Sequence, residues 1–100
     1  MVKHVILWKL KEELTAEEKE NVKADIKEGL EGLAGKVPGL VDVKVNINGL
    51  PTSTVDVMLD TTFTDADALK AYSTNPLHVA IADGKVRPYT AVRSCLDYEV

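Results

Sequence analysis

Four side chains in this sequence could do chemistry in a shared site: His4, Trp8, Tyr72 and His78. Histidine is the strongest candidate, because its unperturbed pKa of about 6.5 lets it take or give a proton near neutral pH. Tyr72 precedes His78 by six residues, across the dipeptide Asn75-Pro76. This spacing could bring a phenol and an imidazole to the mouth of one pocket, as hydrogen-bond donor and general base.

Each of these side chains also has a structural interpretation. His4 and Trp8 lie on one side of a predicted strand with Ile6, where a satisfied core histidine and a packed tryptophan are the simpler roles. Tyr72 falls on the apolar side of a short helix, and a core ring with its hydroxyl at the rim is the default there. His78 could cap or bridge a helix break. The residues alone leave both sets of roles open.

Common catalytic signatures are absent from the sequence. It has no GxSxG, no phosphate loop, no HExxH and no dinucleotide glycine triplet. Two histidines without a spaced set of carboxylates or thiols do not form a recognisable metal site, and the single Cys95 cannot form an internal disulfide. We therefore expect neither a metal nor a cofactor.

Length and charge narrow the class of protein. The chain has 100 residues with 12 basic and 16 acidic side chains, for a net charge of −4. This predicts one domain over residues 1–100 and argues against binding of nucleic acid, which needs clustered Lys and Arg. The longest apolar runs, such as Val5–Trp8, are far below the roughly 18 residues of a membrane span. No signal peptide is recognised, so we expect a cytoplasmic protein without a membrane partner.

Hydrophobic spacing predicts the first two elements. Residues 3–10 form a strand that is apolar on both faces. A helix then begins at Thr15, which can form a capping box with Glu18, and runs to residue 33, with Gly35 as a left-handed end. Acidic residues on this helix are expected to form a solvated face: Asp25, Glu28 and Glu31.

The remaining elements complete an α+β order. A strand over 41–47 should turn Val41, Val43, Val45 and Ile47 inward, and a third strand over 54–63 should pair with it as a hairpin. A short helix after Asp65 breaks at Pro76, a helix resumes over 77–86, and a last strand covers 91–98. This is the ferredoxin-like βαββαβ order, an antiparallel four-stranded sheet with helices on one face.

One layer of helices can cover only one face of that sheet. The other face would expose apolar residues, including Val5, Leu7 and Met58. We therefore predict a two-fold homodimer that closes the open sheet faces into a homodimeric α+β barrel.

The sequence also resembles the stress-responsive dimeric A/B barrel family. The stretches VKHVILWKLK (2–11), KVPGL (36–40) and AYSTNPLHV (71–79) are similar to family motifs and occur in the same order, as do Val86-Arg87-Pro88 and Asp97-Tyr98. The resemblance covers essentially the whole chain. It implies the same homodimeric α+β barrel that the bare sheet face indicates.

The resemblance also implies chemistry. In a plant polyketide cyclase of this fold, a tyrosine and a histidine promote an aldol condensation without a cofactor or metal, and Tyr72 and His78 match those two positions. His4 matches a first-strand histidine of that enzyme. Asn75 and Val57 stand where histidines occur in related sequences.

Three hypotheses for function result. The first is a stress-responsive barrel that binds a small, partly apolar molecule between sheet and helices. The second is a cofactor-independent, cyclase-like enzyme with Tyr72 and His78 as its acid/base pair, and the third is a dimeric α+β barrel monooxygenase. In the first two, the ligand-binding residues are expected to be His4, Trp8, Val57 and Phe63.

Overall fold

The elements follow one another in the expected order. The computed structural model describes all residues from Met1 to Val100. Its strands are β1 (Val2–Leu10), β2 (Leu40–Asn46), β3 (Val57–Phe63) and β4 (Thr90–Glu99). Its helices are α1 (Ala16–Glu31), α2 (Ala66–Thr74) and α3 (Pro76–Ile81), and α3 continues into a π-helical turn (Ala82–Val86) and a 3₁₀ turn (Arg87–Tyr89).

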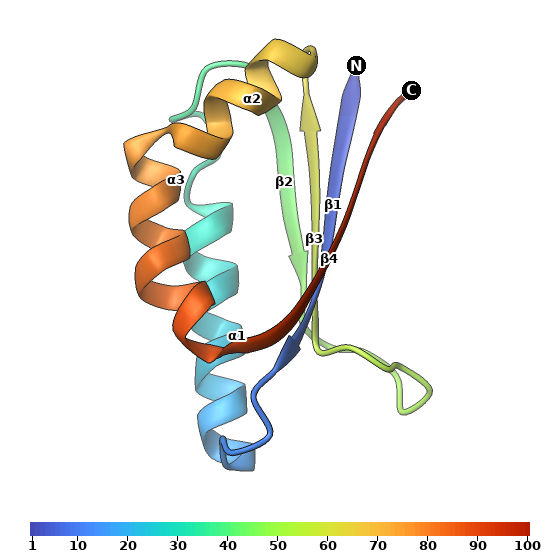
Figure 1. Cartoon of the computed structure of the whole chain (residues 1–100), viewed down its shortest axis with the longest axis vertical. Coiled ribbons are helices and arrows are strands. Elements are labelled where there is room, and N and C mark those ends of the chain that lie inside the picture. The colour runs from blue at the N-terminus through green and yellow to red at the C-terminus, as the bar shows by residue number, and fades with distance from the viewer.

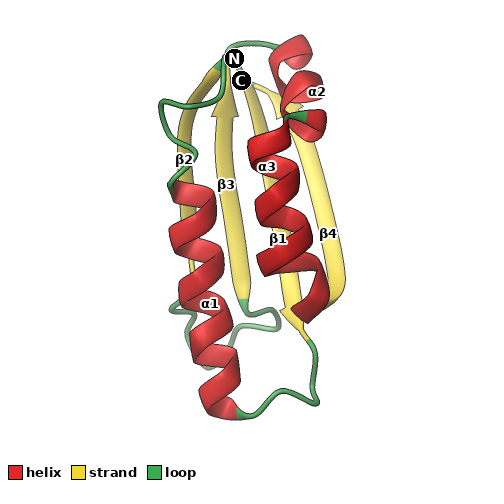
Figure 2. Cartoon of the chain, turned by 90° about the vertical axis from the view of Figure 1, so that its left-hand side faces the viewer, coloured by secondary structure: helices red, strands yellow, loops and turns green.

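The four strands form one sheet with helices on a single face. Neighbouring strands are antiparallel in the order β2-β3-β1-β4. Figure 1 shows α1, α2 and α3 on the same side of the sheet, and Figure 2 shows them from the front with the strands behind. This confirms the predicted ferredoxin-like fold. None of the helices is long and apolar enough to cross a membrane.

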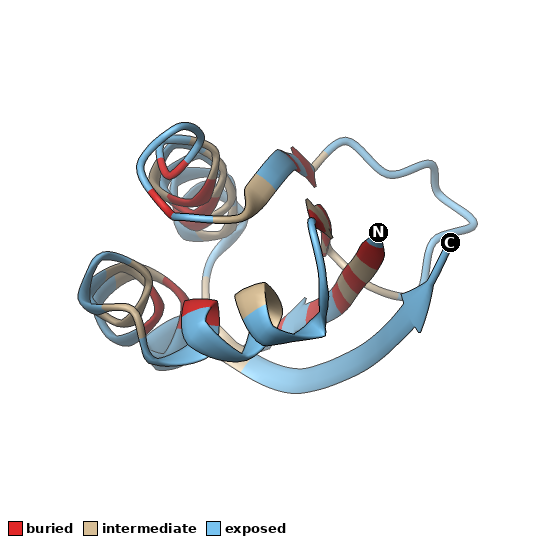
Figure 3. Ribbon diagram, turned by 90° about the horizontal axis from the view of Figure 1, so that it is seen from above, coloured by how far each residue is buried: buried red, intermediate tan, exposed pale blue.

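Strand β1 provides the floor of the core. Its even-numbered residues are all buried against the helices: Val2, His4, Ile6, Trp8 and Leu10. Successive strand side chains point to opposite faces, so one local alternation places a histidine and a tryptophan in the layer between sheet and helices. Strand β4, at the sheet edge, is exposed along almost its whole length (Figure 3).

Helix α1 begins as predicted and ends earlier. The Thr15 hydroxyl accepts from the Glu18 backbone N–H at 3.1 Å, and the Glu18 carboxylate accepts from the Thr15 N–H at 2.9 Å. The helix ends at Glu31 rather than at residue 33, because the following N–H groups bond three residues back, from Leu33 to the Leu30 carbonyl and from Ala34 to the Glu31 carbonyl. Gly35 does adopt a left-handed backbone, with φ +76°, but it does so in the turn that follows.

Two further predictions, that Val41 points inward and that Glu31 is a solvated acid, are wrong at strand β2. The pairing register with β3 shifts between Leu40 and Asp42, and this irregularity leaves Val41 50% exposed instead of turned inward. Glu31 is not simply a solvated acid: its carboxylate accepts from the Val45 N–H at 2.9 Å, while Lys27 donates to the Val45 carbonyl at 2.7 Å. Glu31 and Lys27 therefore hydrogen-bond the N–H and the carbonyl of Val45 on an edge strand, where these groups would otherwise be free to pair with another chain.

Candidate functional site

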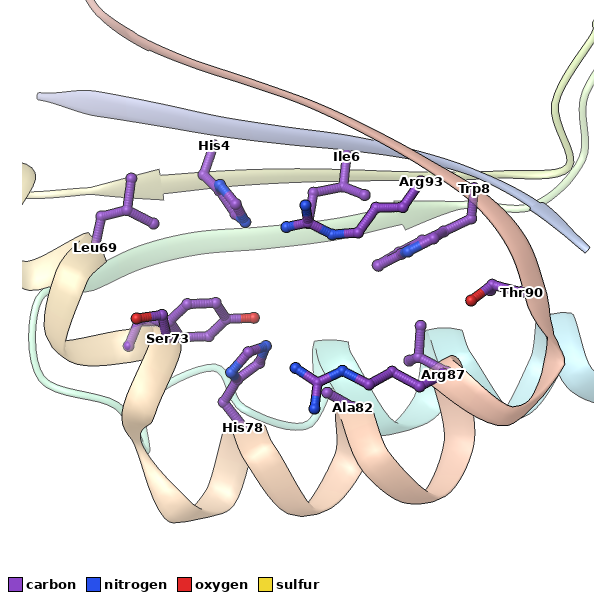
Figure 4. Close-up of a pocket in the computed structure, with 12 residues that line it drawn as sticks. His4, Ile6, Trp8, Leu69, Ser73, His78, Ala82, Arg87, Thr90 and Arg93 are labelled. Carbon is purple, nitrogen blue, oxygen red and sulfur yellow. The ribbon is translucent and has the colours of Figure 1, made fainter.

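A cleft of about 180 Å³ lies between the helix-facing side of β1 and the segment from α2 to β4. Four residues singled out from the sequence line it together: His4, Trp8, Tyr72 and His78. Figure 4 shows the strand residues on one side of this space and His78 on the other. The structure thus brings together side chains that lie up to 74 positions apart, from His4 to His78.

The break at Asn75-Pro76 brings Tyr72 and His78 side by side. Asn75 has an extended backbone that ends α2, and its side chain accepts from the Leu77 N–H at 2.9 Å, which caps α3. Pro76 occupies the first turn of α3, where its missing N–H costs nothing. As a result the two rings lie 4.0 Å apart between centroids at an interplanar angle of 32°.

Tyr72 is a buried and unpartnered donor. Its side chain is 1% exposed, and its hydroxyl makes no hydrogen bond. The ring is held by Phe63 at 5.0 Å and by His4 at 6.2 Å between centroids. Burial raises the pKa of Tyr72 to about 12, so the phenol stays protonated at neutral pH and can only donate or accept a hydrogen bond as a neutral group.

His78 is a half-buried imidazole whose Nδ1 atom makes no hydrogen bond of regular geometry. Burial lowers the pKa of His78 and is the largest cause. The backbone of Ser73 and Tyr72 lies close enough to the ring for weak hydrogen bonding, which raises the pKa, while Arg87 and His4 lower it. At neutral pH the ring is therefore uncharged and able to accept a proton. The Tyr72 hydroxyl and the His78 Nδ1 are not hydrogen-bonded to each other.

His4 is oriented by an acid from the far end of the chain. Its Nδ1 lies 2.5 Å from the Asp97 Oδ1, because β1 and β4 pair His4 with Asp97. An ionised carboxylate can only accept, so the Nδ1 atom of His4 carries a proton and donates it to Asp97.

A third side chain joins this pair. The Sγ atom of Cys95 lies 3.7 Å from the His4 Nδ1 and 3.4 Å from the Asp97 Oδ1. The ligand atoms of the three residues all lie within 4.8 Å of one another, so this cluster could hold a metal ion that the sequence pattern did not indicate. The hydrogen bond between His4 and Asp97 also accounts for their positions without one.

The other two predicted ligand-binding residues lie elsewhere. Val57 and Phe63 are 1% and 0% exposed and belong to the core, and neither is on the wall of the cleft. Both lie on β3, beneath the helices rather than at the opening. Phe63 supports the site indirectly, through its ring contacts with His4 and Tyr72.

Sequence reasoning missed the polar side of the cleft. Four of the lining residues are polar or charged and were not singled out: Ser73, Arg87, Thr90 and Arg93. Arg93 is paired with Trp8 across β1 and β4, and period-2 alternation places it on the same face as Cys95 and Asp97. That alternation was available in the sequence, but the pairing register that puts it beside the first strand was not.

Comparison with known proteins gives a consistent picture. The family model described as the stress responsive A/B barrel domain matches residues 2–100. A dimeric protein of unknown function and ferredoxin-like fold from Bacteroides fragilis is 34% identical, with a TM-score of 0.92 and coverage of 99% of this chain and 95% of that chain. No curated protein matches.

Two structures of enzymes share the fold. A hydroxynitrile lyase from Passiflora edulis is 17% identical, with a TM-score of 0.71 and coverage of 97% of this chain and 90% of that chain. An antibiotic biosynthesis monooxygenase is 11% identical, with a TM-score of 0.76 and coverage of 100% and 98%. At these identities the likeness concerns the fold and does not choose between the two chemistries.

Proposed function

The chain belongs to the stress-responsive A/B barrel domain family, and from that premise we propose that its cleft binds a small, partly apolar molecule and moves a proton on it. Tyr72 is the proposed hydrogen-bond donor and His78 the proposed general base. His4 and Trp8 form the wall on the sheet side.

One observation carries this proposal: two residues of the cleft wall, Tyr72 and His78, each hold a buried polar atom, the Tyr72 hydroxyl and the His78 Nδ1, without a regular hydrogen bond. More than about 90% of buried polar groups in proteins are partnered, and leaving one unpaired costs roughly 1–3 kcal/mol. Two such atoms on neighbouring residues of one cleft are expected where the groups form hydrogen bonds to a bound ligand.

The two groups suit proton abstraction next to a carbonyl. A neutral His78 can take the proton, and the protonated phenol of Tyr72 can donate to the oxygen on which negative charge develops. This is the acid–base chemistry of the cyclase-like hypothesis. No observation in the cleft favours the monooxygenase hypothesis over it.

Hydrogen–deuterium exchange at the methyl group of acetophenone, followed by NMR in deuterated buffer, tests the proposal. We expect the wild-type protein to accelerate this exchange, and His78→Gln to lose most of the acceleration, since a positioned histidine contributes roughly 10²–10⁴ in rate. The control is Thr74→Ala, at the exposed end of α2 outside the cleft. Equal exchange rates for wild type and His78→Gln would contradict the proposal.

A second copy of the chain is proposed to cover the open face of the sheet. Large apolar side chains are exposed there, among them Leu96 at 65% and Leu7 at 36%. They border a groove of about 370 Å³ with Val5, Met58 and Tyr98. Contiguous exposed apolar surface of this kind marks an interface, and a two-fold arrangement would pair this face with itself.

Sedimentation of matched glutamate variants tests the dimer. Leu96→Glu places a charge on the open face and should give a monomer at micromolar concentration. Leu77→Glu places the same charge on α3, at a leucine that is 49% exposed on the helix side, and should leave the dimer intact. A stable Leu96→Glu dimer would contradict the proposed interface.

A further inference from the structure

The cleft is basic in a protein that is acidic overall. Its twelve lining residues include two arginines and two histidines and no aspartate or glutamate. The whole chain has 16 acidic and 12 basic side chains. The lining of the cleft is therefore more basic than the chain as a whole, and the charge of its arginines favours a negatively charged ligand.

The two arginines approach the cleft from opposite sides. Arg93 comes from β4 beside Trp8, and Arg87 comes from the 3₁₀ turn after α3. In Figure 4 both side chains extend into the space between β1 and α3. Arg93 forms no ion pair, and the ion pair of Arg87 is with Asp83 alone, which leaves donors of its five N–H groups unused.

Five further wall residues are apolar, and the cleft is small. Ile6, Trp8, Leu69, Ala82 and Val86 line the same cleft, whose volume is about 180 Å³. An apolar protein cavity of about 150 Å³ can hold a benzene molecule. The space thus suits one six-membered ring with a small polar substituent.

We propose that the ligand of this cleft is a compact organic carboxylate, with its acid group held between Arg87 and Arg93 and its apolar part against Trp8 and Ile6. This inference rests on the proposed function, because it names the class of molecule that the same cleft binds. Arg is suited to this role, since its planar guanidinium can bind a carboxylate through two parallel hydrogen bonds.

A bound carboxylate would also act on His78. Besides burial, the charge of Arg87 lowers the pKa of His78. A negative charge placed between the arginines offsets that effect and favours the protonated imidazole. Carboxylate binding should therefore raise the pKa of His78, whereas an uncharged ligand of the same shape should not raise it.

The test compares cyclohexanecarboxylate with cyclohexanecarboxamide, which has nearly the same shape and no charge. Binding is followed through the fluorescence of Trp8, the single tryptophan of the chain, and through NMR titration of the His78 ring. We expect the carboxylate to bind at least about 10-fold more tightly than the amide, a preference that charge-assisted hydrogen bonds supply. The carboxylate alone should raise the pKa of His78.

Three variants locate the effect. Arg87→Met and Arg93→Met should each weaken carboxylate binding much more than amide binding, because methionine keeps much of the apolar stem and removes the charge. Lys36→Met removes the same charge from an exposed position outside the cleft and should change neither.

Two results would overturn the inference. Equal affinity for acid and amide in the wild-type protein would overturn the carboxylate class and leave the proposed binding site standing. Binding of neither compound would also overturn it, and the acetophenone exchange experiment would then decide the proposed function separately.

Discussion

Replacing Tyr72 with phenylalanine should make the protein more stable and less active. The hydroxyl is buried and has no hydrogen-bond partner, so the folded protein bears its desolvation without compensation. That cost is roughly 1–3 kcal/mol for a buried hydroxyl. Phenylalanine keeps the ring that packs between Phe63 and His78 and removes only the unpaired group.

The magnitude is measurable. An increase of about 1–3 kcal/mol in the free energy of unfolding corresponds to roughly 4–8 °C in Tm per kcal/mol for a domain of this size. Urea unfolding can be followed through Trp8, which is 5% exposed in the folded protein. All samples need one protein concentration, because self-association would make stability depend on it.

The matched control is Tyr89→Phe. Tyr89 is 36% exposed, so removing its hydroxyl should change stability by no more than about 0.5 kcal/mol. Tyr72→Phe should also slow acetophenone exchange, since the donor to the developing oxyanion is gone. A loss of stability in Tyr72→Phe would show that the hydroxyl has a hydrogen-bond partner in the folded protein. It would refute the interpretation of Tyr72 as an unpartnered donor.

Three further outcomes are expected. Gly39→Ala should lower the free energy of unfolding by more than the roughly 1–2 kcal/mol that a left-handed backbone costs, because the φ of Gly39 is +79° and a Cβ atom there would lie 2.5 Å from the Cβ of Ala68. Gly35 has a φ of +76° and open space around it, so Gly35→Ala should lose only the backbone cost. Urea midpoints check both. The hydrogen bond from Lys27 lowers the pKa of Glu31. The contribution of Glu31 to stability is therefore present above about pH 4.5 and is lost as pH falls through the folded-state pKa. Between about pH 6 and pH 3, urea midpoints should fall less steeply in Glu31→Gln than in wild type. NMR titration of His78 should give a midpoint below 6.5, and a midpoint above it would contradict the neutral base; exchange activity should decline as pH falls through that midpoint.

Local rules were sufficient for most of the elements. The alternation in residues 3–10 predicted that His4, Ile6 and Trp8 would face the helices, and the structure buries all three. The capping box of Thr15 and the corner at Pro76 were equally readable, because each depends on residues a few positions apart. Tyr72 and His78 meet across such a corner, so their proximity was predictable as well.

Other features depend on which distant segments pair. The irregularity beside Val41 exists only in the register of β2 against β3, and the bonds of Glu31 depend on where α1 lies relative to Val45. The sequence pattern gave no sign that Val57 and Phe63 would lie off the cleft wall, since the side-chain face of a strand does not say which helix covers it.

By itself the sequence determined the types and the order of the elements and the meeting of Tyr72 with His78. The tertiary structure alone decided the electrostatics of the cleft: Asp97 reaches His4 across 93 positions of chain, and Arg93 comes beside Trp8 on the same strand pair. The physical reason is that alternation and capping act between near neighbours, whereas the partner of a charged side chain is fixed by strand register, which depends on the packing of the whole sheet.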